Sequence, residues 1–249
     1  MLRQENRGVP AAVNRAISIA RSDLIARMDS DDRMLPDRLE RQLKFLAENP
    51  DAAVVCGHAY LISASGKRVG KARTPVDVER GKRELAPERF VEIIQSTVLM
   101  RKQDVLSVGG YREDITYSED RELWGRIVTS GRMIRCQQEF LLDFRLHSGA
   151  MSMQKALRNS TTCKFIDLNI VRSLRGKPHL SYDELDRWYK SLSVWQRIND
   201  RKLFLALFHF KNASRHFAER EWFPFLYSFG IAVTLRPLFI LHRVASKLA

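Results

Sequence analysis

The amino-acid sequence predicts an α/β layered domain over residues 1–150, followed by an all-helical region over residues 151–249. Up to about residue 150, segments with apolar residues at three- and four-residue steps alternate with short segments rich in Val, Ile and Ala, a pattern typical of alternating helices and strands. Beyond this point only helical spacing remains. The hydrophobic share of 45% and the charged share of 29% are those of a folded globular protein.

The beginning of the chain is predicted to form a helix, a strand, an acidic turn and a second helix. The first helix covers Val9–Ala20, where Pro10 suits the first turn. A short buried strand follows over Asp23–Met28, and the second helix runs from about Pro36 to Glu48. Three leucines of this second helix are expected to face inward: Leu39, Leu43 and Leu46.

The rest of the α/β domain continues the alternation. The predicted elements are a strand over Ala52–Ile62, a polar loop from Ser65-Gly66 through Arg83, a strand over Ser96–Met100, a turn at Gly109-Gly110, a helix over Glu119–Ser130 and a strand pair over Met133–Phe144. In the helical region, Ser181 and Glu184 form a capping box that predicts a helix start.

Net charge and cysteine content limit the partners and the location. The chain has 42 Lys and Arg against 29 Asp and Glu, and this excess suits a phosphate-bearing ligand. No nucleic-acid motif occurs and the clustered aspartates would repel a phosphate backbone, so nucleic acid is not an expected partner. Because Cys56, Cys136 and Cys163 are far apart and no secretion signal opens the chain, we expect a cytoplasmic protein.

An acidic motif directly follows the first predicted strand. Asp29, Asp31 and Asp32 lie within four residues, and clustered carboxylates at the end of a strand suit Mg²⁺ or Mn²⁺, which prefer oxygen ligands. They could instead be an acidic entry to the next helix, where carboxylates meet the helix dipole. A phosphatase motif of the haloacid-dehalogenase type is disfavoured, because Arg33 stands where that motif needs Thr or Val.

Two further motifs lie later in the α/β domain. Glu119 and Asp120 start a predicted helix, where an acid could act as a general base or simply cap the helix. Arg145 and His147 follow the last predicted strand and would share one face of it. That face could offer a cation and an imidazole to a diphosphate or its metal, although a lone His is more often structural.

In their order along the chain, these motifs resemble family 2 glycosyltransferases. The segments that carry the resemblance are Asn6-Arg7-Gly8, Ala12-Val13-Asn14, Leu24 to Asp32, Pro36-Asp37-Arg38-Leu39, Ser96 to Arg101, Gly109 to Glu113, Glu119 to Trp124 and Arg145-Leu146-His147. One departure is Val13, where the family usually has Arg.

The resemblance implies a GT-A (nucleotide-diphospho-sugar transferase) domain that moves a sugar, with inversion, to a saccharide or lipid-linked acceptor in bacterial surface polysaccharide synthesis. It implies Asp120 as the catalytic base and a metal, Mn²⁺ or Mg²⁺, held by Asp31, Asp29 and His147. The nucleotide-sugar ligands that it implies are Asp29, Asp32, Asn14 and Arg145.

The position of the acidic motif departs from the family pattern. Family members begin with a Val- and Ile-rich strand and a second strand that together hold the nucleotide base, and their acidic motif lies further along the chain than Asp29 does here. We therefore expect a domain that lacks its first strands, whose activity is in doubt. The alternative is a non-catalytic fragment or scaffold that retains the fold.

The helical region mixes aromatic with basic residues, particularly between Trp222 and Leu241. This mixture suits a helix that lies in a membrane interface, with its apolar face in the head-group region and its cations toward anionic lipid. A plain helical bundle would explain the same pattern. The sequence thus favours a protein that contacts the cytoplasmic face of the inner membrane peripherally.

Overall fold

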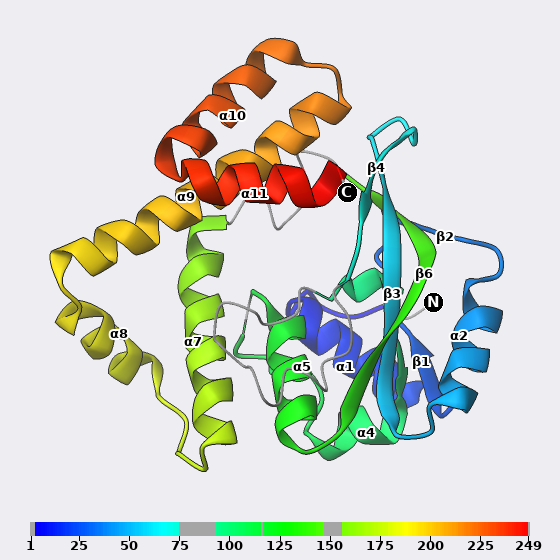
Figure 1. Cartoon of the computed structure of the whole chain (residues 1–249). Helices are drawn as coiled ribbons and strands as arrows, with labels where there is room; N and C mark the ends of the chain where they lie inside the picture. Colours follow the sequence, from blue (N-terminus) through cyan, green and yellow to red (C-terminus); the bar gives the residue numbers. More distant parts are fainter. Residues whose placement is uncertain (1–2, 75–92, 116, 147–155, 249) are drawn as a thin grey trace. The chain divides into compact units, whose positions relative to one another are not determined.

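A computed structural model describes residues 3–74, 93–115, 117–146 and 156–248 (Figure 1). Residues 75–83 of the predicted polar loop and the predicted site residue His147 lie outside these ranges. The described part of that loop is not irregular as predicted, because Arg68–Ala72 form a strand that pairs with Ala52–Ile62. The chain divides into two compact units. The first comprises residues 1–60, 72–144 and 161–179, and the second comprises residues 61–71, 145–160 and 180–249.

A sheet with helices on both faces organises the α/β part of the chain. Its elements are α1 (Val9–Ile19), β1 (Leu24–Ala26), β2 (Arg33–Met34), α2 (Arg38–Glu48), β3 (Ala52–Ile62), β4 (Arg68–Ala72), the 3₁₀ turn η2 (Gln95–Thr97), β5 (Leu99–Arg101), α4 (Lys102–Ser107), α5 (Glu119–Thr129), β6 (Met133–Arg145) and α7 (Ala156–Leu174). The strand order is β1-β5-β3-β6-β2, and β4 pairs with β3. The pairs β1–β5, β3–β5 and β2–β6 are antiparallel.

Two apolar clusters pack against β3 from opposite sides. Cys56 belongs to a cluster with Trp124 and Ile127 of α5, whereas its neighbour Val55 packs with Leu46 of α2. This follows from the strand geometry, because successive side chains point to opposite faces of a sheet. Figure 1 shows α2 on one side of the sheet and α1 with α5 on the other.

The predicted α/β layering and the strand over Ala52–Ile62 are confirmed. The prediction of a strand pair over Met133–Phe144 is wrong, because β6 is one continuous strand. The sequence between Met133 and Arg145 contains no Gly or Pro, so nothing in it favours a hairpin turn. The strand predicted to begin at Ser96 instead begins at Leu99, after η2.

The predicted inward face of α2 is also wrong for two of its three leucines. Leu39 and Leu43 are 39% and 48% exposed, whereas Arg38 and Gln42 are fully buried together with Leu46. The buried face therefore follows the steps 38, 42 and 46. Arg38 and Gln42 are buried because they form a hydrogen-bonded network with backbone carbonyls near the acidic turn.

The C-terminal part of the second unit, from residue 180 onward, is helical, as predicted. It contains α8 (Tyr182–Ser191), α9 (Val194–Ala218), α10 (Trp222–Leu235) and α11 (Pro237–Leu248). The predicted capping box of Ser181 and Glu184 is formed at the start of α8. Ala206 and Phe210 of α9 pack against residues of α10 and α11 to form its core. None of the helices in the described ranges combines the length and apolar character needed to cross a membrane.

Candidate active site

The acidic turn after β1 is fixed by contacts to η2 and to the end of the strand. The backbone N–H of Asp29 donates to Ser96 Oγ at 3.0 Å, and Ser96 Oγ donates to Asp29 Oδ2 at 3.1 Å. Arg27 Nη1 lies 2.6 Å from Asp29 Oδ1. Both carboxylate oxygens of Asp29 thus have partners that orient the side chain.

The buried guanidinium of Arg38 stabilises the acidic turn by hydrogen bonds to the backbone that flanks it. Its Nη2 donates to the carbonyls of Arg27 and Val98, each at 3.1 Å, and its Nε donates to Gln42 Oε1 at 2.9 Å. Gln42 Nε2 in turn donates to the Thr97 carbonyl at 2.8 Å. A single helix face therefore ties the end of β1 to η2.

The other two aspartates of the turn differ in exposure. Asp31 is exposed, whereas Asp32 is only 6% exposed. Burial lowers the pKa of Arg38 to about 10, and the charge of Asp32 acts against this shift. We infer that Asp32 compensates the buried cation, which leaves Asp31 as the aspartate most accessible to a ligand.

The second acidic motif opens α5. Ser118 precedes the helix with a left-handed backbone (φ 55°), and Glu119 and Asp120 are its first two residues. The Arg121 N–H donates to Asp120 Oδ1 at 2.8 Å. The structure thus confirms that the two acids start a helix.

The carboxyls of this motif are electrostatically coupled to the acidic turn. Burial raises the pKa of Glu119 to about 7, the Asp120 and Asp29 charges raise it further, and Arg27 acts in the opposite direction. Burial also raises the pKa of Asp120, against Arg121 and Arg27. Two motifs that lie far apart in the sequence therefore meet around the Arg27 guanidinium.

The hydroxyl of Tyr111 is electrostatically coupled to Asp120, Glu119 and Arg27 of this cluster. Tyr111 is 2% exposed, and burial raises its pKa to about 12. Its hydroxyl accepts a hydrogen bond from Gln95 Nε2 at 3.3 Å. The phenol stays protonated at neutral pH, so it adds no negative charge to the cluster.

Asn14 of α1 fixes the turn that carries Tyr111. Its Nδ2 donates to the Tyr111 carbonyl at 2.7 Å, and its Oδ1 accepts the Tyr111 N–H at 2.8 Å. Gly110 in this turn has φ 66°, and a Cβ there would lie 2.8 Å from Asn14 Oδ1, so a larger residue would not fit. The predicted contact of Asn14 with a nucleotide sugar stays a prediction.

Arg145, from the third sequence motif, belongs to the second unit. Arg145 Nη1 donates to the carbonyls of Ser63 and Ala64 at 3.2 and 2.7 Å, next to the β3–β4 turn. The predicted diphosphate contact of Arg145 is untested by this geometry. The predicted role of His147 also stays a prediction.

The chemistry of the acidic turn fits a hard divalent cation. Among the residues that the structure describes, no three His, Cys, Asp or Glu side chains gather closely enough to hold a metal ion by themselves. Mg²⁺, however, is commonly bound by one or two carboxylates together with substrate phosphates and water. The exposed Asp31 and the oriented Asp29 supply oxygen ligands of this kind.

Sequence reasoning missed the residues that assemble the site. Arg27 and Ser96 contact the Asp29 carboxylate, and Arg38 donates to a backbone carbonyl next to the acidic turn. Tyr111 is buried and electrostatically coupled to Glu119 and Asp120. All four lie inside the segments that carry the family resemblance. Their roles depend on contacts between residues up to about a hundred positions apart, which spacing along one helix or strand does not reveal.

Residues 1–106 match the sequence profile of glycosyl transferase family 2. This part of the chain is therefore similar to family 2 glycosyltransferases, and the predicted α/β layering with a helical region after it is confirmed.

Curated glycosyltransferases are also similar to this chain. The chain is 28% identical over 158 residues to an uncharacterized glycosyltransferase of Haemophilus influenzae, covering 63% of this chain and 57% of that protein. It is 35% identical over 140 residues to the O-antigen biosynthesis glycosyltransferase WbnJ of Escherichia coli, covering 55% and 53%.

A third relative is named for its donor and acceptor. It is the UDP-Glc:alpha-D-GlcNAc-diphosphoundecaprenol beta-1,3-glucosyltransferase WfaP of Escherichia coli, 26% identical over 167 residues, covering 65% of this chain and 62% of that protein. The chain thus spans little more than half the length of these relatives.

Proposed function

We propose that the protein transfers a sugar from a nucleotide-diphosphate donor to a saccharide or lipid-linked acceptor, with inversion at the anomeric carbon. The observation that carries this proposal is the electrostatic coupling of Glu119 to Asp120 and to the Asp29–Arg27 ion pair. It supports the proposal because transfer needs an acidic metal site beside a carboxyl that can accept a proton.

On the donor side, Asp31 and Asp29 would hold Mg²⁺ or Mn²⁺. The metal would offset the negative charge left on the diphosphate when the sugar departs. Ser96 and Arg27 orient Asp29 for this role, and Asp32 balances Arg38 beneath it. We also propose that Asn14, Asp32, Arg145 and His147 contact the nucleotide sugar or its metal.

On the acceptor side, the carboxylate of Asp120 takes the proton of the attacking hydroxyl. The hydroxyl oxygen forms a bond to the anomeric carbon while the bond from that carbon to the diphosphate oxygen breaks. The proton moves to Asp120, and the nucleoside diphosphate leaves. The raised pKa of the adjacent Glu119 and Asp120 supports this role, since a base is most effective when its pKa lies near the working pH.

The acceptor class is proposed from the relatives. WbnJ is named for O-antigen biosynthesis, and WfaP is named for an acceptor on diphosphoundecaprenol. We propose the same setting for this chain, namely glycan assembly on a lipid carrier at the cytoplasmic face of the membrane. A peripheral membrane contact would bring the enzyme to such an acceptor.

Two substitutions separate metal binding from base catalysis. We expect Asp31→Ala to weaken the binding of Mn²⁺ and of UDP with Mn²⁺, measured by calorimetry, because a carboxylate ligand is lost. We expect Asp120→Asn to leave this binding near the parent value and to lower sugar transfer by about a hundredfold or more, measured as nucleoside diphosphate released from a panel of nucleotide sugars.

Asp23→Ala, which removes an exposed aspartate just before β1, is the matched control and should change neither quantity. Transfer at the parent rate by Asp120→Asn would show that Asp120 only starts the helix, and Glu119 would be examined next as the base. If the parent protein bound no nucleoside diphosphate in the presence of Mn²⁺, the non-catalytic scaffold would be favoured.

A further inference from the structure

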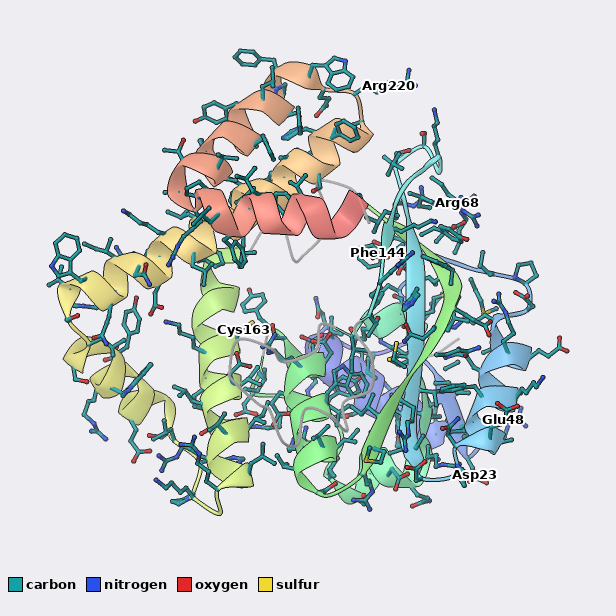
Figure 2. The ribbon with its side chains drawn as sticks, viewed as in Figure 1. Asp23, Glu48, Arg68, Phe144, Cys163 and Arg220 are labelled. Carbon is teal, nitrogen blue, oxygen red and sulfur yellow. The ribbon has the colours of Figure 1, made fainter. Side chains whose placement is uncertain are left out.

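An exposed group of apolar side chains surrounds the turn between α9 and α10. The chain reverses at Arg220, whose φ of 60° is left-handed. Figure 2 shows Arg220 at the end of this helical hairpin. We call the exposed group the aromatic tip, and it consists of Phe217 (52% exposed), Trp222 (57%), Phe223 (82%), Leu226 (64%) and Tyr227 (64%).

The base of the aromatic tip is packed firmly. The ring centroids of Phe217 and Trp222 are 5.8 Å apart, and those of Phe217 and Phe225 are 5.5 Å apart. Phe225 stacks on Phe229 at 5.6 Å, and Phe229 packs against the core of the second unit. The rings of Phe217 and Trp222 are thus held in place before any partner arrives, which lowers the entropic cost of docking.

The exposed face of α10 carries no charge. The whole helix, Trp222–Leu235, contains no Asp, Glu, Lys or Arg. Its buried side is formed by Ser228 and Ala232, so the larger residues Phe223 and Leu226 are the ones that face solvent. A surface helix normally carries polar residues on its solvent face, and an exposed apolar patch therefore indicates an interaction site.

The net charge of the helical segment that carries the tip favours an anionic partner. The two acids of the turn are compensated internally, since Arg215 Nη1 lies 3.0 Å from Glu219 and 3.9 Å from Glu221, and His216 Nδ1 lies 2.5 Å from Glu221. Basic residues dominate the sequence from Val194 onward. They are Arg197, Arg201, Lys202, Lys211, Arg215, Arg220, Arg236, Arg243 and Lys247, against Asp200, Glu219 and Glu221.

We propose that the aromatic tip docks on an anionic lipid bilayer, with Phe223 and Leu226 entering the head-group region and Arg220 meeting lipid phosphates. Rings and aliphatic chains beside Arg220, on a helical segment of net positive charge, match the layered chemistry of such a surface. A second copy of this chain fits less well, because two segments of the same net positive charge would repel each other. This inference rests on the proposed function, because it identifies the segment that would bring the enzyme to a membrane-bound acceptor. Its test requires no sugar substrate.

The test is co-sedimentation of the full chain with vesicles of phosphatidylglycerol and phosphatidylethanolamine. We expect the parent to bind these vesicles at least about tenfold more tightly than vesicles of phosphatidylcholine alone. The double substitution Phe223→Ser and Leu226→Ser should weaken binding by about tenfold or more. The reason is that the variant loses the apolar surface that the parent transfers from water into the bilayer on binding. Arg220→Glu should weaken binding to the anionic vesicles alone.

The matched control is the double substitution Val194→Ser and Trp195→Ser at the start of α9, where the two side chains are 60% and 79% exposed. It removes comparable apolar surface away from the tip and should leave vesicle binding unchanged. A second readout uses Trp222. A variant with Trp188→Phe and Trp195→Phe keeps only Trp222 and the buried Trp124, and lipids brominated on their acyl chains should quench the part of its fluorescence that comes from Trp222.

Three outcomes would overturn the proposal. They are a parent protein that does not sediment with anionic vesicles, a control variant that loses binding as much as the tip variant does, and a tip that mediates self-association without vesicle binding. None of these results depends on glycosyl transfer. A failure of lipid docking is therefore distinguishable from a failure of the proposed enzymatic activity.

Discussion

Arg121 and Asp167 form a two-point ion pair between α5 and α7, with Nε–Oδ1 and Nη2–Oδ2 distances of 2.7 and 3.0 Å. Arg121 directly follows the proposed base Asp120. Ser118 Oγ also lies 3.1 Å from Cys163 Sγ of α7. The helix start that carries the two carboxyls is thus anchored to a helix that begins after residue 150, within the first compact unit.

Removal of Asp167 should therefore destabilise the first unit. We expect Asp167→Ala to lower the free energy of unfolding by about 2–4 kcal/mol, because it leaves the mostly buried Arg121 cation without its partner. Urea unfolding followed by circular dichroism would measure this change. Asp186→Ala breaks a solvent-exposed ion pair with Lys190 and should have little effect. An equal effect of the two substitutions would contradict an anchoring role for Asp167.

The buried face of α2 gives a second prediction. Leu46→Ala should cost about 2–5 kcal/mol of stability, as expected for a buried leucine, whereas Leu43→Ala should cost less than about 1 kcal/mol. Arg38→Lys should cost about 1–3 kcal/mol, because an ammonium cannot reach the carbonyls of Arg27 and Val98 while keeping the bond to Gln42. Thermal and urea unfolding would rank these variants. A Leu43→Ala protein as unstable as Leu46→Ala would show that the leucine face is buried after all.

Elements with strong local signals could be predicted from the sequence. The β-branched run of β3 and the periodic helix α5 were placed within one residue of their observed ends. The face of α2 could not be predicted in this way, because hydrophobic spacing assumes that leucines turn inward and charges outward. Arg38 reverses that rule, since its burial is stabilised by carbonyls of Arg27 and Val98 that lie elsewhere in the chain.

The acidic residues of the candidate site were predicted from the sequence, but the residues that hold them in position were not. Asp29 and Glu119 stand out because carboxylates cluster beside apolar segments. Ser96 and Arg27 carry no such signal, since a serine before a strand and an arginine within one are common. Their function arises only when the fold brings η2 beside the acidic turn.

Ser96 is the basis of a third prediction, which rests on the proposed metal site. Ser96→Ala removes the hydroxyl that both accepts from the Asp29 N–H and donates to Asp29 Oδ2. Because partners that orient a ligand contribute to metal affinity, we expect Mn²⁺ affinity to fall by about tenfold or more, measured by calorimetry. Ser107→Ala removes a hydroxyl that donates to the Asp104 carbonyl at the end of α4 and should leave the affinity unchanged. Unaltered Mn²⁺ binding by Ser96→Ala would exclude Asp29 as an oriented ligand.

The raised pKa of Glu119, about 7 against an ordinary value of 4.5, predicts a specific dependence of stability on pH. At about pH 4 and below, Glu119 is mostly protonated in both the folded and the unfolded chain, so its ionisation has little effect on stability. As pH rises, the unfolded chain ionises first, and stability is lost progressively until the folded carboxyl has ionised near pH 7. Glu119→Gln should therefore match the parent at about pH 4 and exceed it at about pH 8 by on the order of 2 kcal/mol. Urea unfolding across this range would measure the difference, with the exposed Glu40→Gln as a control that should follow the parent curve. A constant difference between Glu119→Gln and the parent at every pH would show that Glu119 titrates normally and is not held in the buried carboxylate cluster.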